Sequence, residues 1–202
     1  GAATLKGTNV LGQTYVTGGG LNFAAGSSNR LTGTLVIQGG SVTIDAPVFS
    51  TAEVQMNTVD GGRSVLYINA DLYATRLRAA ATDNMLSGGA IFQTAGTLLG
   101  TSAGNGLTVS DGTGNYGYYG LAGGVVSGDV VVAYRGPAVF EQTGGAVTPS
   151  NQIQLVNNSG YAVYNLFAGS FNAPATPAGY INMAASAYGG AHDARHAVHQ
   201  SR

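Results

Sequence analysis

The chain has 202 residues, a net charge of −1 at pH 7, and only 8% charged residues. Its eight basic residues are scattered and form no basic stripe, so we expect no nucleic-acid partner. The absence of Cys excludes a disulfide framework and thiol chemistry, and no apolar run is long enough to span a membrane.

Pairs of small residues recur along the chain, beside an aromatic residue or Leu and a stretch of aliphatic residues. The second residues of these pairs are spaced by 21, 56, 28, 21 and 24 residues. The long interval divides into 31 and 25 if residues 69–73 hold a degenerate copy. A repeat of this size indicates one structural unit stacked on itself, here about seven times. The marker residues are Gly19, Gly40, Gly96, Gly124, Gly145 and Gly169.

Short apolar or alternating runs lie between these markers, bounded by Gly, Asn, Asp or Ser, and each predicts a short strand. Few two-residue turn signals join them, which disfavours an antiparallel sandwich. We therefore predict an all-β fold, a right-handed parallel β-helix (β-solenoid) of about seven turns. The predicted strands cover residues 35–38, 42–44, 54–56, 65–68, 107–109, 130–134 and 153–156.

The predicted solenoid domain covers residues 1–183, with a C-terminal tail, 184–202, that we expect to be disordered or a short helix. Residues 74–86 are rich in helix formers and predict a short helix or a lateral loop. We expect core packing rather than charge to hold the rod together. The aliphatic residues expected to fill the core include Val36, Ile44, Val131 and Ile153.

Residues 143–147 and 157–171 resemble the repeats of secreted bacterial β-helix proteins, which include autotransporter passengers and related surface proteins. Units of that family often read Q-T-G-G-x-[VL] and Y-N-L-S-G-G-x-[LF]. The resemblance covers roughly residues 10–183, although Phe167 and Ala168 stand where the family usually has Ser and Gly. It implies a surface adhesin, a structural fibre or, less often, a carbohydrate-active enzyme.

An enzyme on this scaffold needs clustered carboxylates with a basic residue nearby. No two acidic residues here lie closer than seven positions, but a solenoid stacks equivalent positions about 5 Å apart. Carboxylates stacked with Arg76 or Arg135 on one face would indicate an enzyme, and bare faces a scaffold. We expect most of these acids to be solvated corner residues. They are Asp45, Glu53, Asp60, Asp71, Asp83, Asp111, Asp129, Glu141 and Asp193.

Three further patterns allow a functional or a purely structural interpretation. Residues 111–115 place oxygen ligands at alternate positions, as in a calcium loop, but a Gly-rich corner has the same sequence. The tail histidines would share one face of a helix and could bind Zn²⁺ or Ni²⁺, although a polar tail has such spacing by chance. The tyrosines that alternate with Gly could stack on sugar rings or form an aromatic ladder. The residues are His192, His196 and His199, and Tyr116, Tyr118 and Tyr119.

We predict a non-enzymatic, extracellular or cell-surface β-solenoid with a structural or adhesive role, without a metal or cofactor. The expected partners are further copies of the chain, stacked end to end through open strand edges, and a polysaccharide or cell surface. A charged residue or Pro at Val10 or Ile181 should block the stacking. The alternative is a carbohydrate-active enzyme or sugar-binding module with a groove along one solenoid face.

Overall fold

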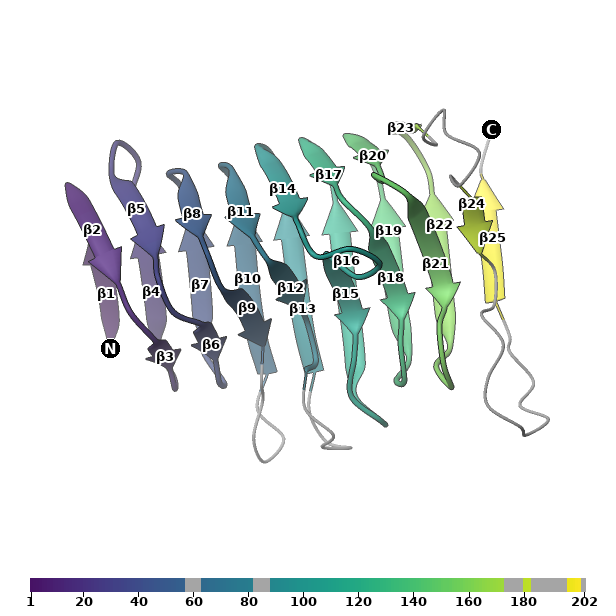
Figure 1. The fold of residues 1–202 in the computed structure, drawn as a ribbon, viewed down its shortest axis with the longest axis horizontal. Coiled ribbons are helices and arrows are strands. Elements are labelled where there is room, and N and C mark those ends of the chain that lie inside the picture. The colour runs from purple at the N-terminus through teal and green to yellow at the C-terminus, as the bar shows by residue number, and fades with distance from the viewer. Residues whose placement is uncertain (57–62, 82–87, 173–179, 183–195, 201–202) are drawn as a thin grey trace.

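The chain winds into a parallel β-solenoid in which each turn contributes one strand to each of three sheets (Figure 1). The computed structural model describes residues 1–56, 63–81, 88–172, 180–182 and 196–200. Successive turns stack along the rod from β1 near the N-terminus to β25 (Figure 1). The described residues contain no helix, and therefore none long and apolar enough to cross a membrane. The predicted fold class and the repeat of about seven turns are confirmed.

The first sheet has nine parallel strands and carries the longest ones. Its strands are β1 (Ala2–Leu5), β4 (Gly20–Phe23), β7 (Ser41–Ile44), β10 (Arg63–Ile68), β13 (Gly88–Gln93), β16 (Tyr116–Leu121), β19 (Ala138–Gln142), β22 (Ala162–Leu166) and β25 (His196–Gln200).

The second sheet has eight parallel strands of two to four residues. They are β2 (Thr8–Leu11), β5 (Ser28–Leu31), β8 (Val48–Ser50), β11 (Leu72–Ala74), β14 (Thr97–Gly100), β17 (Val125–Ser127), β20 (Ala146–Thr148) and β23 (Ser170–Phe171).

The third sheet also has eight parallel strands, and all seven predicted strands coincide with strands of the first or the third sheet. The members of the third sheet are β3 (Thr14–Val16), β6 (Leu35–Ile37), β9 (Glu53–Met56), β12 (Arg76–Arg78), β15 (Leu107–Ser110), β18 (Val130–Ala133), β21 (Gln152–Val156) and β24 (Tyr180–Asn182).

The strand register corrects one part of the predicted repeat. Gly40 directly precedes β7 of the first sheet, whereas Gly96 precedes β14 of the second. The 56-residue interval between them therefore contains two full turns and, in addition, the part of a turn that leads from the start of the first sheet to the start of the second. The predicted 31-residue turn is wrong. Along the first sheet, Val42 pairs with Leu66 and Leu66 with Ile91, so these two turns are 24 and 25 residues long.

Alternating inward side chains of the three sheets form one continuous core. At the C-terminal end of the first sheet, Tyr119, Phe140 and Tyr164 stack face to face inside it. Their ring centroids are 4.8 Å apart in both steps. Parallel stacking with identical spacing follows from the register, because the three residues are direct partners in adjacent strands.

All four predicted core residues are buried, but only two of them lie in the main core cluster. Ile44 and Ile153 belong to it, whereas Val36, 4% exposed, and Val131, 0% exposed, are buried outside it. Val36 pairs in register with Tyr15, which is 56% exposed, so its side chain points to the outer face of the third sheet. Both residues sit in uninterrupted apolar runs, where the sequence does not reveal which alternate residues point inward.

The helix or loop predicted for residues 74–86 is wrong where the structure describes it. Residues 76–78 form β12, in which Leu77 is fully buried between two outward-pointing arginines. Tertiary pairing with β9 and β15 overrides the local helix propensity here. Residues 82–87 lie outside the described part of the chain.

In the tail, residues 196–200 form β25, which pairs with β22 and extends the first sheet beyond the predicted boundary at residue 183. This part is a strand in the structure. Residues 183–195 and 201–202 lie outside the described residues.

Buried glutamines close the corner between the first and second sheets. The Gln142 Nε2 group donates to the carbonyl oxygens of Gly145 at 3.2 Å and Ser170 at 3.1 Å, which lie in successive turns. The Tyr164 hydroxyl donates to Gln142 Oε1 at 2.6 Å. Gln93 and Tyr119 form an equivalent pair two turns earlier. These bonds satisfy polar groups that would otherwise be costly to bury, and they tie neighbouring turns together.

Candidate functional site

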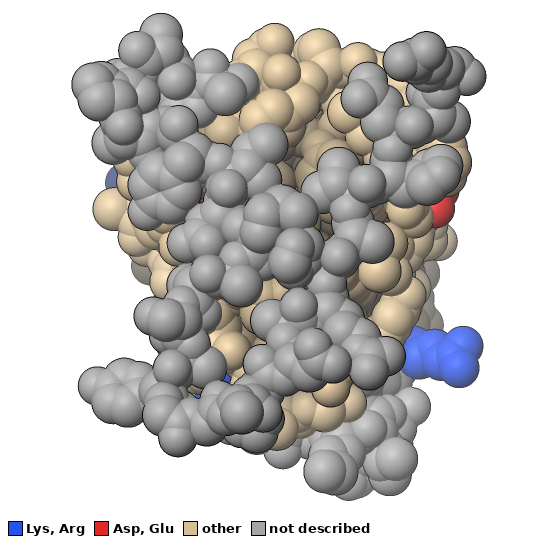
Figure 2. Space-filling model, turned by 90° about the vertical axis from the view of Figure 1, so that its right-hand side faces the viewer, with Lys and Arg blue, Asp and Glu red and all other residues tan. Residues whose placement is uncertain are grey.

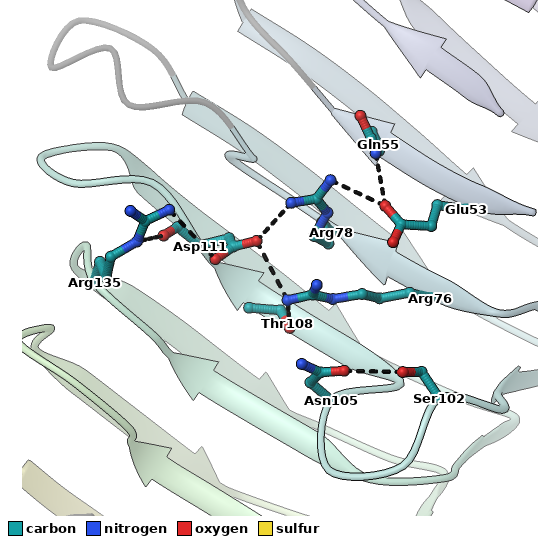
Figure 3. A network of polar contacts seen from close by, with 9 residues as sticks. All are labelled: Glu53, Gln55, Arg76, Arg78, Ser102, Asn105, Thr108, Asp111 and Arg135. Atoms are coloured by element: carbon teal, nitrogen blue, oxygen red, sulfur yellow. Dashed lines mark hydrogen bonds and ion pairs between the residues drawn. The ribbon is translucent and has the colours of Figure 1, made fainter. Parts of the chain in front are cut away.

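Five charged side chains meet on the outer side of the third sheet and form the charged cluster (Figure 3). Arg76 and Arg78 point outward from β12 because Leu77, between them, points into the core. Glu53 is the register partner of Arg76 on β9. Asp111 directly follows β15, and Arg135 lies just after β18. The cluster therefore joins four successive turns.

Asp111 is the centre of the charged cluster. Its Oδ2 atom lies 2.8 Å from Arg78 Nη1 and 3.3 Å from Arg76 Nη2. Its Oδ1 atom lies 3.8 Å from Arg135 Nη2, and Arg135 Nε donates to the Asp111 carbonyl oxygen at 2.9 Å. Arg78 also pairs with Glu53, at 2.9 Å. One carboxylate thus holds guanidinium groups from two other turns.

The side chains of the charged cluster are largely buried. The Asp111 side chain is only 5% exposed, and those of Arg76 and Arg135 are 18% and 33% exposed. Burial lowers the pKa of the Arg76 guanidinium, while the negative charge of Asp111 opposes that shift. Each ionised group depends on its partners because an isolated charge at this depth would be poorly solvated.

This arrangement partly meets the expectation stated for an enzyme, since Asp111 lies beside Arg76 and Arg135. However, Arg78 lies between Asp111 and Glu53, and both carboxylates are already ion-paired. A general acid or base must be free to exchange a proton with a substrate. The geometry instead suits a staple that holds four turns together. The expectation that core packing rather than charge holds the rod together stays a prediction, which substitutions in the cluster can test.

The candidate calcium loop, residues 111–115, is a corner. The Asp111 carboxylate is occupied by arginines, and the Ser110 hydroxyl donates to the Asn115 carbonyl oxygen at 3.0 Å. Gly112 N–H donates to the Ala80 carbonyl oxygen at 2.9 Å, which packs the corner against the preceding turn. Among the described residues, no three His, Asp or Glu side chains are grouped to hold a metal ion.

The other acidic residues are spread over several corners. Asp129 accepts backbone N–H groups of Gly104 at 2.6 Å and Asn151 at 2.8 Å, and it is only 4% exposed, so it is not a solvated corner as expected. Asp71 accepts the Thr97 N–H at 2.7 Å. Asp45 instead accepts the Asn69 side-chain amide at an exposed site. The structure does not describe Asp60, Asp83 and Asp193.

The predicted histidine and tyrosine sites are rearranged by the fold. His196 and His199 belong to strand β25, so the helical face assumed for them does not form, and His192 lies outside the described residues. Tyr119 is in the core, whereas Tyr116 and Tyr118 lie on the outer face of the first sheet.

On this outer face there is a hollow of about 720 Å³. Sequence reasoning found its tyrosines but missed Arg63 and Phe92, which belong to earlier turns. Pairing of Arg63 with Gly88, and of Gly88 with Tyr116, brings these turns together. The hollow is lined by Arg63, Ser64, Val65, Gly88, Gly89, Ala90, Phe92, Gly114, Tyr116 and Tyr118.

No protein-family model matches the chain, and no curated protein or solved structure shows significant similarity to it. The function is therefore inferred from the geometry of the structure itself.

Proposed function

We propose that the protein is a non-enzymatic β-solenoid with a structural or adhesive role outside the cell or on its surface. The observation that carries this proposal is the aromatic outer surface. Phe49 and Tyr73 stack on the second sheet at 4.9 Å, and Tyr67 and Phe92 on the first at 5.7 Å. Phe49 is 52% exposed. Stacked aromatic rings at a protein surface are typical of interaction sites.

The charged cluster supports the structural part of the proposal. A chain with few charges places five of them together, where they bind four turns to one another. In the view toward the C-terminal turns, most of the described surface is neither basic nor acidic (Figure 2). Such a surface has little electrostatic repulsion against a neutral partner or another copy.

End-to-end assembly is part of the same proposal. In the sheet order, β1, β2 and β3 each have a neighbour on one side only. Their open backbone groups can pair with the last turn of a second copy, a head-to-tail contact that propagates into a filament.

The proposal is tested by one experiment with two readouts. Purified protein is incubated with insoluble polysaccharides, and both the retained protein and newly released reducing ends are measured, while light scattering follows assembly with increasing concentration. Retention or concentration-dependent assembly without product release is expected. Release of sugar, or a monomer that is retained by no surface, would overturn the proposal.

A carbohydrate-active enzyme is the second candidate, and the charged cluster is the observation that favours it. Asp111 and Glu53 lie on one face with three arginines, and this candidate requires that substrate binding frees one of these ion-paired carboxylates to act as acid or base. If this candidate is correct, the protein releases sugar and Asp111→Asn abolishes the release while the fold persists.

A further inference from the structure

The hollow on the first sheet results from missing side chains in one strand. In β13 the outward positions carry Gly88 and Ala90, while their partners in β10 and β16 are larger. Arg63 and Tyr116 flank Gly88, and Tyr118 flanks Ala90. The small residues form the floor, and the flanking side chains form the walls.

The walls are aromatic. Phe92 and Tyr118 lie 5.5 Å apart with their rings tilted by 47°. A Cβ atom at Gly120 would lie 3.0 Å from the Tyr118 ring and its hydroxyl, so the absence of a side chain at position 120 lets this ring lie over the strand. Tyr116, 48% exposed, forms the wall on the opposite side. These rings offer apolar surface to a flat ligand.

Arg63 is the charged residue that lines the hollow, whereas Glu141, on the neighbouring strand β19, lies outside the lining. Arg63 is exposed at its rim, and no described carboxylate lies within ion-pair distance of it. The Tyr118 hydroxyl bonds to Glu141, and burial together with the charge of Glu141 raises the pKa of this tyrosine. Arg63 is therefore the group available to an incoming anion, while Glu141 already has a partner.

We propose that this hollow binds an acidic saccharide, with the apolar face of a pyranose ring against the aromatic walls and its carboxylate against Arg63. This inference rests on the proposed adhesive function and names its ligand class. A guanidinium group binds a carboxylate through two parallel hydrogen bonds, and its charge repels a cationic ligand. The volume of about 720 Å³ lies in the usual range for small-molecule sites.

The test is titration calorimetry of the full chain with two acidic probes and their neutral counterparts. The probes are 3′-sialyllactose with lactose, and an unsulfated hyaluronan tetrasaccharide with its carboxyl-reduced form. We expect at least one acidic probe to bind at millimolar concentration and its neutral counterpart to bind about tenfold more weakly.

Three variants locate the site. Tyr116→Ala removes a wall, and Ala90→Leu fills the floor without entering the core; each should weaken binding about tenfold. Arg63→Gln should reduce affinity for the acidic probe to that for the neutral one. Tyr161→Ala is the matched control, because it removes an aromatic ring that is 57% exposed and does not line the hollow.

Failure of both acidic probes to bind, or equal binding of the neutral forms, would overturn this inference. So would equal loss of affinity in Tyr161→Ala. If every variant of the hollow is still retained on polysaccharide, this inference is overturned, but the proposed adhesive function is not. Cleavage of a probe would instead overturn the proposed function.

Discussion

Replacement of Asp111 by Asn should destabilise the rod more than any other single charge removal in the charged cluster. Asn has nearly the same shape but lacks the negative charge. Three guanidinium groups, from Arg76, Arg78 and Arg135, would then face one another across turns without their central counter-ion.

The magnitude follows from burial and geometry. Removing one partner of a buried ion pair costs about 3–5 kcal/mol, because the remaining charge is left without compensation. Here the arginine side chains remain 18–33% exposed, so water solvates part of the excess charge, and Asn keeps one acceptor oxygen. We therefore expect a loss of about 2–3 kcal/mol in the free energy of unfolding. For a chain of this size this lowers the Tm by about 4–12 °C.

Urea denaturation and differential scanning calorimetry measure the loss, and hydrogen exchange shows where it acts. The Gly112 amide, which donates to Ala80, should exchange faster in the variant. Asp45→Asn is the matched control, because Asp45 accepts a single hydrogen bond, from Asn69, at an exposed site. Its effect should stay within about 0.5 kcal/mol.

An equal, small effect of both substitutions would refute the interpretation of the cluster as a staple. A large loss that disappears in ~1 M salt would also contradict it, since a buried network is screened much less than surface charges.

Three further outcomes are expected. Ile153→Ala should cost about 2–4 kcal/mol in urea denaturation because the side chain is in the core, and a loss under about 1 kcal/mol would contradict that position. Burial raises the pKa values of Tyr119 and Tyr164 above the usual 10.0. Above that pH the unfolded chain releases these protons and the folded chain keeps them, so each tyrosine should lower stability by about 1.4 kcal/mol per pH unit. Above pH 10, the free energy of unfolding should fall less steeply with pH in the double variant Tyr119→Phe/Tyr164→Phe than in the original protein. The same slope in both proteins would count against the role of these two tyrosines. Finally, Thr32 N–H donates to the Leu11 carbonyl oxygen, so by alternation Val10 faces the open edge of β2. Val10→Pro should abolish concentration-dependent growth in light scattering without lowering the Tm, and undiminished growth would exclude assembly through this edge.

Local features of the sequence determined the repeat and most of the strands. Corner residues such as Gly124 adopt a positive φ, 78° here, that other residues avoid, so they mark turns wherever they occur. Alternation of apolar and polar residues, as in β7, gave the inward face directly. Both signals act over a few residues, which is why they can be read without the fold.

Only the tertiary structure shows which residues of different turns become neighbours, because this depends on the register between turns. Turn lengths along the first sheet vary from 18 residues, between Ala2 and Gly20, to 34, between Ala162 and His196, so equivalent positions cannot be found by counting. The ion pair of Arg76 with Asp111 spans 35 residues and exists only because the stacked turns bring the two together. The same holds for the hollow, since its walls and floor come from different turns. Uninterrupted apolar runs such as β18 carry no alternation, so only the structure assigns Val130 to the main core cluster and Val131 to the outer side of the third sheet, where it is also buried.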